Sequence, residues 1–353
     1  MASEAARLEN AAWLEARPLL ETLAAFPAGS IRPVGGCVRD TLLGRPVKDI
    51  DLACAMPPKA VMACLKAAGL RALPTGLAHG TVTALAGDAA YEITSLRVDV
   101  KTFGRRARVA FTSDWAADAA RRDFTMNALY CDPDGALFDP LGGLEDARAG
   151  LVRFIGQGTR RIAEDALRIL RYFRFYAWYQ PPGLPPDPAS LDACTEEAAR
   201  LKALSGERVQ QEMRRLLLAP ALAAAWPLMK QAGALTQILP EHLLEAVEDT
   251  ARLQRLMTLE AHFAAIVQQH PWRRLLLLTG QSGEAVSSMA RRWRLDNASQ
   301  ARMHAICEAL PGFNLDNLKS RNRLFDQLPG DWCHDVLLLA CLNLLVKIGL
   351  PRE

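Results

Sequence analysis

The sequence lacks the features that define several whole classes of protein. Its eight cysteines are scattered and form no Cys-x-x-Cys pair, which argues against a zinc site. Because the chain is not a small secreted scaffold, we expect these thiols to be reduced core residues. The longest apolar run near the end, VLLLACLNLLV, is too short to span a bilayer. The first residues have no apolar signal core and carry Glu4, Glu9 and Glu15, so we expect a soluble, cytoplasmic protein without a membrane partner.

The sequence also lacks a large excess of charge of either sign. Lysine and arginine number 42 against 39 aspartates and glutamates, which leaves a net charge of +3. This sum does not mark a nucleic-acid-binding protein, and it does not exclude one, because binding depends on where the charges lie. Of the 353 residues, 50% are hydrophobic, which excludes wholesale disorder. The length indicates roughly two or three domains.

The patterns that are present change in character along the chain. Strand-like runs and helical stretches are mixed in the first part, and helical patterns rich in leucine, alanine, arginine and glutamate follow to the end. We therefore predict an α+β fold, with a mixed domain followed by a helical remainder. The first ~25 residues are expected to form an amphipathic helix. The strand-like runs are 31–34, 49–54, 80–86, 91–98, 108–112 and 128–132.

Two adjacent glycines, Gly35 and Gly36, follow the first strand-like run and precede a predicted helix. Glycine lets the backbone approach a ligand closely, and the free N–H groups at the start of a helix attract phosphate. Arg39, in the first turn of that helix, adds a fixed positive charge. A simple connector between strand and helix has the same sequence pattern, so the turn alone leaves both interpretations open.

Asp49 and Asp51 alternate along the next predicted strand, so we expect their side chains on one face. Two carboxylates so placed repel each other unless a cation lies between them, and such oxygen ligands suit Mg²⁺ that also holds phosphates. Glu92, in the run 91–98, completes the set if its strand lies beside theirs. Solvated acids on an exposed strand are the alternative. Next to a phosphate-binding turn, the metal site is the favoured interpretation.

At this point the residues resemble a known family. GGCVRD, followed by LLGRPVKDIDLAC, is similar to the head domain of class II tRNA nucleotidyltransferases (CCA-adding enzymes) and bacterial poly(A) polymerases, within the polymerase-β-like nucleotidyltransferase superfamily. Four later segments resemble further family motifs in the right order. They are RRDFTMNALY (121–130), DPLGGLEDARAGLVRFIG (139–156), EDALRILR (164–171) and SGERVQQEMRRLL (205–217).

The resemblance implies an enzyme that adds nucleotides to an RNA 3′ end with Mg²⁺ as cofactor. Asp49 and Asp51 match the catalytic metal-binding pair. Two further groups match nucleotide-binding motifs: Gly35, Gly36 and Arg39 on the triphosphate side, and Arg122, Asp123 and Asn127 at ribose and phosphates. From its chemistry, a carboxylate beside a guanidinium suits a ribose hydroxyl, and it also fits a buried salt bridge.

Asp165, Arg168 and Arg171 follow at helical spacing in the segment EDALRILR, and we expect them side by side on one helix. Aspartate only accepts and arginine only donates hydrogen bonds, which matches the amino group and ring nitrogen that cytosine and adenine both present. The resemblance implies that these residues act as a protein template for base recognition. On its own, the pattern is more typical of an intrahelical salt bridge. Glu207 and Arg208, after a predicted helix start at Ser205, are expected to brace this helix.

Within the family, the sequence favours CCA addition. The CCA-adding type is resembled by the run Gly-x-x-His-Gly-Thr-Val-Thr at 76–83. The segment 98–115 resembles the flexible loop of complete CCA-adding enzymes. The basic run that bacterial poly(A) polymerases carry at the place of 76–83 is absent. We therefore expect addition of CCA to tRNA from CTP and ATP, with release of pyrophosphate. The alternatives are poly(A) addition, A-only or CC-only addition, and a catalytically inactive RNA-binding protein of the same fold.

The resemblance implies an N-terminal helix at 1–28, a catalytic head at 29–140, a base-recognition neck at 141–200, a body at 201–270 and a tRNA-binding tail at 271–353. Arginine clusters in the helical part are available for RNA phosphates, although each also fits a solvated helix face. They are Arg160–Arg161, Arg171, Arg174, Arg214–Arg215, Arg273–Arg274 and Arg291–Arg292–Arg294. Trp178, Tyr179, Trp226 and Trp272 are expected in the core.

Overall fold

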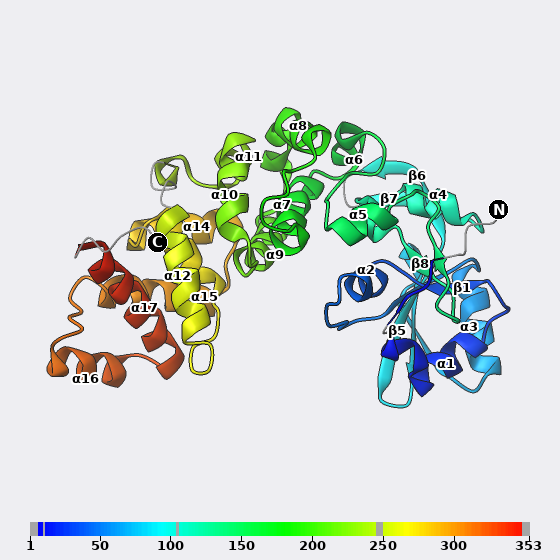
Figure 1. Ribbon diagram of the computed structural model, residues 1–353, viewed down its shortest axis with the longest axis horizontal. Coiled ribbons are helices and arrows are strands. Elements are labelled where there is room, and N and C mark those ends of the chain that lie inside the picture. Colours follow the sequence, from blue (N-terminus) through cyan, green and yellow to red (C-terminus); the bar gives the residue numbers. More distant parts are fainter. Residues whose placement is uncertain (1–5, 10, 104–105, 245–249, 348–353) are drawn as a thin grey trace. The chain divides into compact units, whose positions relative to one another are not determined.

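The computed structural model describes residues 6–9, 11–103, 106–244 and 250–347. The chain forms two compact units, one of residues 1–165 with 179–190, the other of residues 166–178 with 191–353. Strands lie in the first unit, whereas the second is helical wherever it has regular structure (Figure 1). This confirms the predicted α+β fold. The finer division into neck, body and tail stays a prediction.

The first unit is built on a mixed sheet with the strand order β1-β2-β5-β4-β3. β2 and β5 are parallel, and the other neighbours are antiparallel. Sequence reasoning missed β3, which contains Pro74. Proline cannot donate to a ladder and is tolerated at a sheet edge, which is where β3 lies. The bounds are β1 Ile31–Pro33, β2 Asp51–Cys54, β3 Arg71–Gly76, β4 Thr81–Ala86 and β5 Ala89–Ser95.

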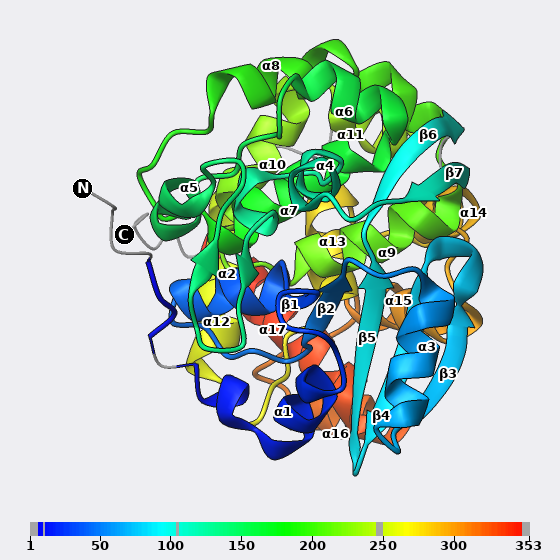
Figure 2. The same ribbon diagram turned by 90° about the vertical axis from the view of Figure 1, so that its right-hand side faces the viewer.

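One face of this sheet is covered by α1 (Arg17–Ala24) and α3 (Pro58–Ala67), as Figure 2 shows. Leu52, Val82 and Ile93, in register on three strands, are fully buried on this side. Their neighbours along each strand point to the opposite face. There Asp51, Glu92 and Thr83 form a row across β2, β5 and β4.

The remaining elements of the first unit surround this open face. A core of small and aromatic residues, including Val34, Ala53 and Tyr130, closes one part of it. The segment expected as a flexible loop at 98–115 forms most of a β6–β7 hairpin. The elements are α2 Gly36–Leu42, β6 Arg97–Phe103, β7 Arg106–Phe111, α4 Trp115–Ala120, β8 Tyr130–Cys131, β9 Leu137–Phe138, α5 Leu144–Ala149 and α6 Gly158–Glu164.

The predicted helix over the first 25 residues is wrong in its extent. Among the described residues of this segment, the α-helix covers only Arg17–Ala24, after a 3-10 turn at Ala12–Glu15. Earlier residues run beside β9 instead: the Leu8 amide donates to the Gly135 carbonyl at 2.9 Å. Pro18 explains where the helix begins, because proline fits the first turn but blocks a helix that would run through it.

The second unit consists of helices that bury large aromatic side chains. Trp226 and Trp272 are buried, as predicted. Among the described residues, none of the helices combines the length and apolar character that crossing a bilayer requires. The helices are α7 Leu167–Tyr179, α8 Pro188–Glu196, α9 Gly206–Leu217, α10 Leu222–Gln231, α11 Ala234–Ile238, α12 Thr250–His262, α13 Pro271–Thr279, α14 Gly283–Trp293, α15 Asn297–Ala309, α16 Leu318–Gln327 and α17 Gly330–Lys347, with the last residue of α7 and the start of α8 belonging to the first unit.

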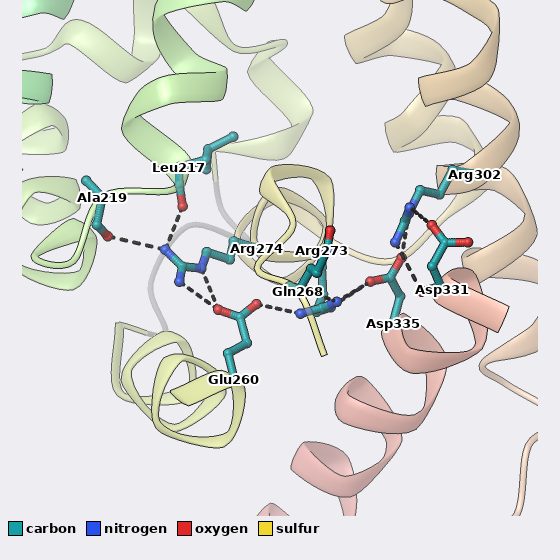
Figure 3. A network of polar contacts seen from close by, with 9 residues as sticks. All are labelled: Leu217, Ala219, Glu260, Gln268, Arg273, Arg274, Arg302, Asp331 and Asp335. Atoms are coloured by element: carbon teal, nitrogen blue, oxygen red, sulfur yellow. Dashed lines mark hydrogen bonds and ion pairs between the residues drawn. The ribbon is translucent and has the colours of Figure 1, made fainter. Parts of the chain in front are cut away.

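A buried ionic network joins five segments of the second unit (Figure 3). Glu260 of α12 accepts from Arg273 at 2.8 Å and from Arg274 at 2.6 Å, and all three side chains are at most 1% exposed. Arg274 also donates to the Leu217 and Ala219 carbonyls at the end of α9. On the other side, Asp335 of α17 accepts from Arg273 and from Arg302 of α15, and Arg302 also pairs with Asp331.

This network corrects the prediction for Arg273 and Arg274. They neither face RNA nor line a solvated helix face, because their guanidinium groups are enclosed and bonded within the protein. Three guanidinium groups meet three carboxylates, so the network is neutral as a whole. Buried charges are tolerated when they are paired and hydrogen-bonded in this way.

We predict that Glu260→Gln lowers the free energy of unfolding by about 3–5 kcal/mol, because it leaves Arg273 and Arg274 buried with an uncompensated charge. Chemical denaturation followed by circular dichroism measures the loss. Glu145→Gln is the control: its exposed pair with Arg148 should contribute at most about 1 kcal/mol. Equal effects of the two substitutions would contradict a stabilising role of the network.

Candidate active site

Two carboxylates lie side by side on the open face of the sheet. Asp51, the first residue of β2, is the direct partner of Glu92 on the parallel strand β5. Both side chains are exposed to solvent on this face. Thr83 on β4 continues the row on the far side of Glu92. Asp49 corrects the sequence prediction in one respect: it precedes β2 in a segment without regular structure, so strand alternation does not set its orientation.

The electrostatics of Asp51 show an excess of negative charge on this face. Partial burial raises the pKa of its carboxyl group, and the charges of Glu92 and Asp49 raise it further, while Arg122 opposes them. Carboxylates that repel one another are suited to a divalent cation, and oxygen donors are the ligands of Mg²⁺. Among the described residues, no three histidine, cysteine, aspartate or glutamate side chains converge into a preformed metal site. The fit to a cation therefore rests on donor chemistry and repulsion.

The glycine turn lies beside these acids. The Val34 amide donates to the Asp51 carbonyl at 2.9 Å, and Gly35 follows with φ of +73°, a conformation that favours glycine. A Cβ atom on Gly35 would lie 3.6 Å from Nη1 of Arg122, and one on Gly36 3.7 Å from Nη2 of Arg39. Two guanidinium groups thus reach the turn from which α2 begins.

Arg39 is buried, with a relative exposure of 6%, and its guanidinium nitrogens are hydrogen-bonded. Nε donates to Asp40 at 2.9 Å, Nη1 to Asn127 Oδ1 at 2.5 Å and Nη2 to the Tyr179 hydroxyl at 2.6 Å. Asn127 is held in turn by Asp123, which accepts from its Nδ2 atom at 3.1 Å. The structure thus brings together Arg39, Asn127 and Asp123, three of the predicted nucleotide-binding residues.

The partner of Arg122 is Asp118, which sequence reasoning missed. Asp118 is 1% exposed and accepts from Arg122 at 3.1 Å, from Arg121 at 2.8 Å and from the Tyr130 hydroxyl at 2.9 Å. Burial alone would raise the pKa of Asp118, but the two guanidinium charges and these hydrogen bonds outweigh it and lower the pKa. The signal in the sequence was the spacing of four residues between Asp118 and Arg122 on α4 and the turn after it.

Asp118 also explains why the predicted pairing of Arg122 with Asp123 is not the one observed. Asp123 accepts from the Phe124 amide at 2.9 Å and from Asn127, and it is 7% exposed. Its carboxylate therefore organises the turn at residues 123–127. Adjacent residues at the end of a short helix point in different directions, so sequence neighbours need not pair.

The predicted base-recognition residues do not share one helix. Asp165 follows the last residue of α6 with extended backbone, and α7 begins at Leu167 and carries Arg168 and Arg171. Aspartate favours helix ends because its side chain competes with the helical backbone, which accounts for the break. Asp165 belongs to the first unit and the two arginines to the second. Their shared role stays a prediction.

Support for α7 comes from α9, but through a residue that the sequence did not single out. Glu212 of α9 is 5% exposed and accepts from Arg174 of α7 at 2.6 Å. α9 begins after Ser205 as predicted, although Ser205 makes no side-chain capping bond. Glu207 pairs with Arg294 at 2.7 Å, so its observed contact is with the residue that follows α14. Glu212 lies at i+5 from Glu207, inside the motif 205–217, and that motif was its only signal.

A separate hollow of about 690 Å³ lies in the second unit, between α12, α17 and the segment 310–316 that follows α15. It is lined by residues such as Arg252, Phe313 and Asn343 and shares none with the acids or the glycine turn. The volume of this hollow is therefore no reason to place the active site there. The Asp51 carboxyl group, whose pKa is raised, lies on the charged face of the sheet, and that face is the candidate site.

Comparison with family models matches two segments of the chain. Residues 31–153 match the poly A polymerase head domain, which contains the acids, the glycine turn and Arg122. Residues 183–244 match a segment described as the probable RNA and SrmB-binding site of polymerase A.

Individual relatives give the same result. The mitochondrial CCA tRNA nucleotidyltransferase 1 of Homo sapiens is 44% identical over 189 residues, which are 53% of this chain and 44% of that protein, so the chain spans less than half of this relative. A crystal structure of the Bacillus stearothermophilus CCA-adding enzyme in complex with CTP matches 96% of this chain and 80% of that one, with a TM-score of 0.71 and 29% identity. The CCA-adding enzyme of Streptococcus gordonii is 33% identical over 330 residues, 92% of this chain and 77% of that protein. The chain therefore belongs to the family of CCA-adding enzymes.

Proposed function

We propose that this protein adds the nucleotides CCA to tRNA 3′ ends, using CTP and ATP and releasing pyrophosphate. The observation that carries the proposal is the meeting of three features on one face of one sheet: the Asp51–Glu92 pair, the glycine turn and Arg122. The named activities of the relatives in Homo sapiens and Streptococcus gordonii support it.

In this mechanism, Asp49, Asp51 and Glu92 hold Mg²⁺. When bound, Mg²⁺ lowers the pKa of the RNA 3′-hydroxyl and neutralises charge on the triphosphate. Arg122 and Arg39 stabilise negative charge on the phosphates, while the backbone at Gly35 and Gly36 lets the phosphates approach. The RNA 3′-hydroxyl releases its proton to solvent and its oxygen bonds to the α-phosphorus. The bond between the α-phosphorus and the oxygen that bridges it to the β-phosphorus breaks, and pyrophosphate leaves with that oxygen.

Base selection is assigned to Asp165, Arg168 and Arg171. An acceptor beside a donor pairs with the amino group and ring nitrogen that cytosine and adenine share, whereas uracil and guanine present the reverse pattern. Mismatched groups would be left buried without hydrogen bonds, which is the strongest basis for rejecting a substrate. Arg174 pairs with Glu212 of α9, which helps to hold α7, the helix that carries Arg168 and Arg171.

The helical unit is proposed to hold tRNA by its backbone. After the correction for Arg273 and Arg274, the exposed candidates of this unit are Arg214, Arg215, Arg291 and Arg294, and Arg160 of α6 in the first unit is a further one. Contacts of arginine to phosphates position RNA without reading its sequence.

A cytoplasmic location stays a prediction from the sequence: the eight free thiols agree with a reducing compartment, whereas the vertebrate relatives are named mitochondrial.

Poly(A) addition is the second candidate, because the matched head domain is described as that of poly A polymerase. The two activities differ in product. CCA addition to a tRNA that lacks its 3′ end stops after three nucleotides, A-only or CC-only addition stops earlier, and poly(A) addition gives long tails on generic RNA. An inactive RNA-binding protein would incorporate nothing.

We predict that Asp49→Ala or Asp51→Ala abolishes incorporation of labelled CTP and ATP into such a tRNA, while tRNA binding stays nearly intact. The acids supply the metal site and contribute little to holding RNA. Asp88→Ala is the control, because Asp88 is an exposed acid in the turn between β4 and β5 of the same sheet. Residual rates within about tenfold of the wild type would contradict the assignment.

We predict that Glu92→Gln raises the melting temperature in metal-free buffer at neutral pH. The raised pKa means that folded Asp51 binds its proton more tightly than unfolded Asp51, so stability falls as the pH rises through the folded pKa. Removing the charge of Glu92 relieves part of this loss of stability. At pH values below 3.8, the ordinary pKa of aspartate, the difference in melting temperature between the variant and the wild type should shrink.

The same melting experiment tests the cation. Millimolar Mg²⁺ should raise the melting temperature of the wild type more than that of Glu92→Gln, since a ligand stabilises the state that binds it. Asp88→Asn should respond to Mg²⁺ like the wild type. A variant that is less stable than the wild type without metal at pH 7 would speak against repulsion at this site.

We predict that Asp165→Ala reduces the preference for CTP and ATP over UTP and GTP by about tenfold or more, with a smaller effect on turnover. Competition between labelled nucleotides at equal concentration measures this ratio. Asp192→Ala, an exposed acid on α8, should leave the ratio unchanged. Strict CTP and ATP preference in the Asp165 variant would refute the template role.

A further inference from the structure

Tyr179 makes the least expected contact with the site. It is the last residue of α7, and its hydroxyl accepts a hydrogen bond from Nη2 of Arg39 at 2.6 Å. The Arg39 guanidinium carbon also lies 4.1 Å from the centre of the Tyr179 ring, and that of Arg45 lies 4.7 Å from it. The Tyr179 side chain thus takes part in one hydrogen bond and in two cation–π contacts.

The backbone of Tyr179 is fixed as closely as its side chain. A Cβ atom on Gly150 would lie 2.4 Å from the Tyr179 carbonyl oxygen, so only glycine leaves room for this approach. Gly150 has φ of +68° at the end of α5, a conformation that again favours glycine. Tyr179 is therefore held within the first unit by packing that does not involve Arg39.

The residue before it is anchored elsewhere. Trp178 donates from Nε1 to the Arg215 carbonyl of α9 at 2.9 Å, a contact inside the second unit. Two consecutive residues at the end of α7 thus take their contacts from different units. Tyr179 is the last residue of the helix that carries Arg168 and Arg171, and it belongs to the first unit.

We propose that Tyr179 is a positioning residue for Arg39. It holds the guanidinium group beside Gly36, where the proposed function has Arg39 bind the triphosphate. The inference rests on the proposed function, because it takes Arg39 as a ligand of the nucleotide. The motif comparison singled out Arg39 but gave Tyr179 no role beyond the core.

Two other roles for Tyr179 lead to different results. If Tyr179 served only to pack the helix end, its loss would lower the stability of the protein and would change the KM values for tRNA and for nucleotides alike. If it acted through Arg168 and Arg171, its loss would change the ratio of CTP to ATP use. A role through Arg39 affects the triphosphate, which CTP and ATP share, so both nucleotides should be affected by the same factor.

The test compares Tyr179→Phe, which removes only the hydroxyl, with Tyr179→Leu, which also removes the ring. Tyr179→Phe should raise KM for CTP and for ATP by the same factor of about three to ten, with kcat and KM for tRNA unchanged. Tyr179→Leu should raise both KM values by about tenfold or more, because the cation–π contacts are lost as well. Tyr176→Phe, on the same helix, is the matched control and should behave like the wild type.

A binding measurement makes the proposal independent of catalysis. Calorimetry with inorganic tripolyphosphate and Mg²⁺ should show a dissociation constant that rises by the same factors in the two variants. Tripolyphosphate affinity equal to that of the wild type in both variants, or a changed CTP-to-ATP ratio, would overturn the role of Tyr179. A wild type that binds tripolyphosphate but incorporates no nucleotide would instead overturn the proposed function and leave the positioning role supported.

Discussion

The structure of the first unit is organised around the repulsion between carboxylates on one open sheet face. Asp51 and Glu92 are forced together by the parallel register of β2 and β5, and Asp49 adds to their negative charge. Partial burial and, after it, the charges of Glu92 and Asp49 raise the pKa of Asp51, so the ionised carboxylate costs stability in the absence of a cation. Such a cost persists where function requires it, and the buried residues on the opposite face of the same strands stabilise the arrangement.

Arg122 opposes this charge, and both Arg122 and Arg39, the two cationic groups at the glycine turn, are oriented by hydrogen-bonded partners. Arg122 is held by Asp118, and Arg39 by Asn127 and Tyr179. Preorganised charges stabilise a transition state without having to reorganise during the reaction. The partners lie on α4, the turn after it and the end of α7, so the precision of the site depends on elements outside the sheet.

Arginine serves a second purpose in the helical unit. Arg273 and Arg274 sit in a neutral buried network with Glu260 and Asp335 and connect α12, α13, α17 and the end of α9. In an amino-acid sequence, an arginine pair of this kind looks the same as one that binds RNA. Only burial and partners separate the two uses, which is why charge clusters predict nucleic-acid contacts poorly by themselves.

The sequence alone determined the α+β organisation, most strands of the head and the set of acids, glycines and arginines at the candidate site, because these depend on local periodicity and on short motifs. Tertiary structure decided what depends on partners far apart in the chain. It placed Asp49 outside the strand and Asp165 outside α7, paired Arg122 with Asp118, and brought Tyr179 to Arg39 across 140 positions of sequence. Pairing of side chains follows from packing in three dimensions, and no periodicity in the sequence records it.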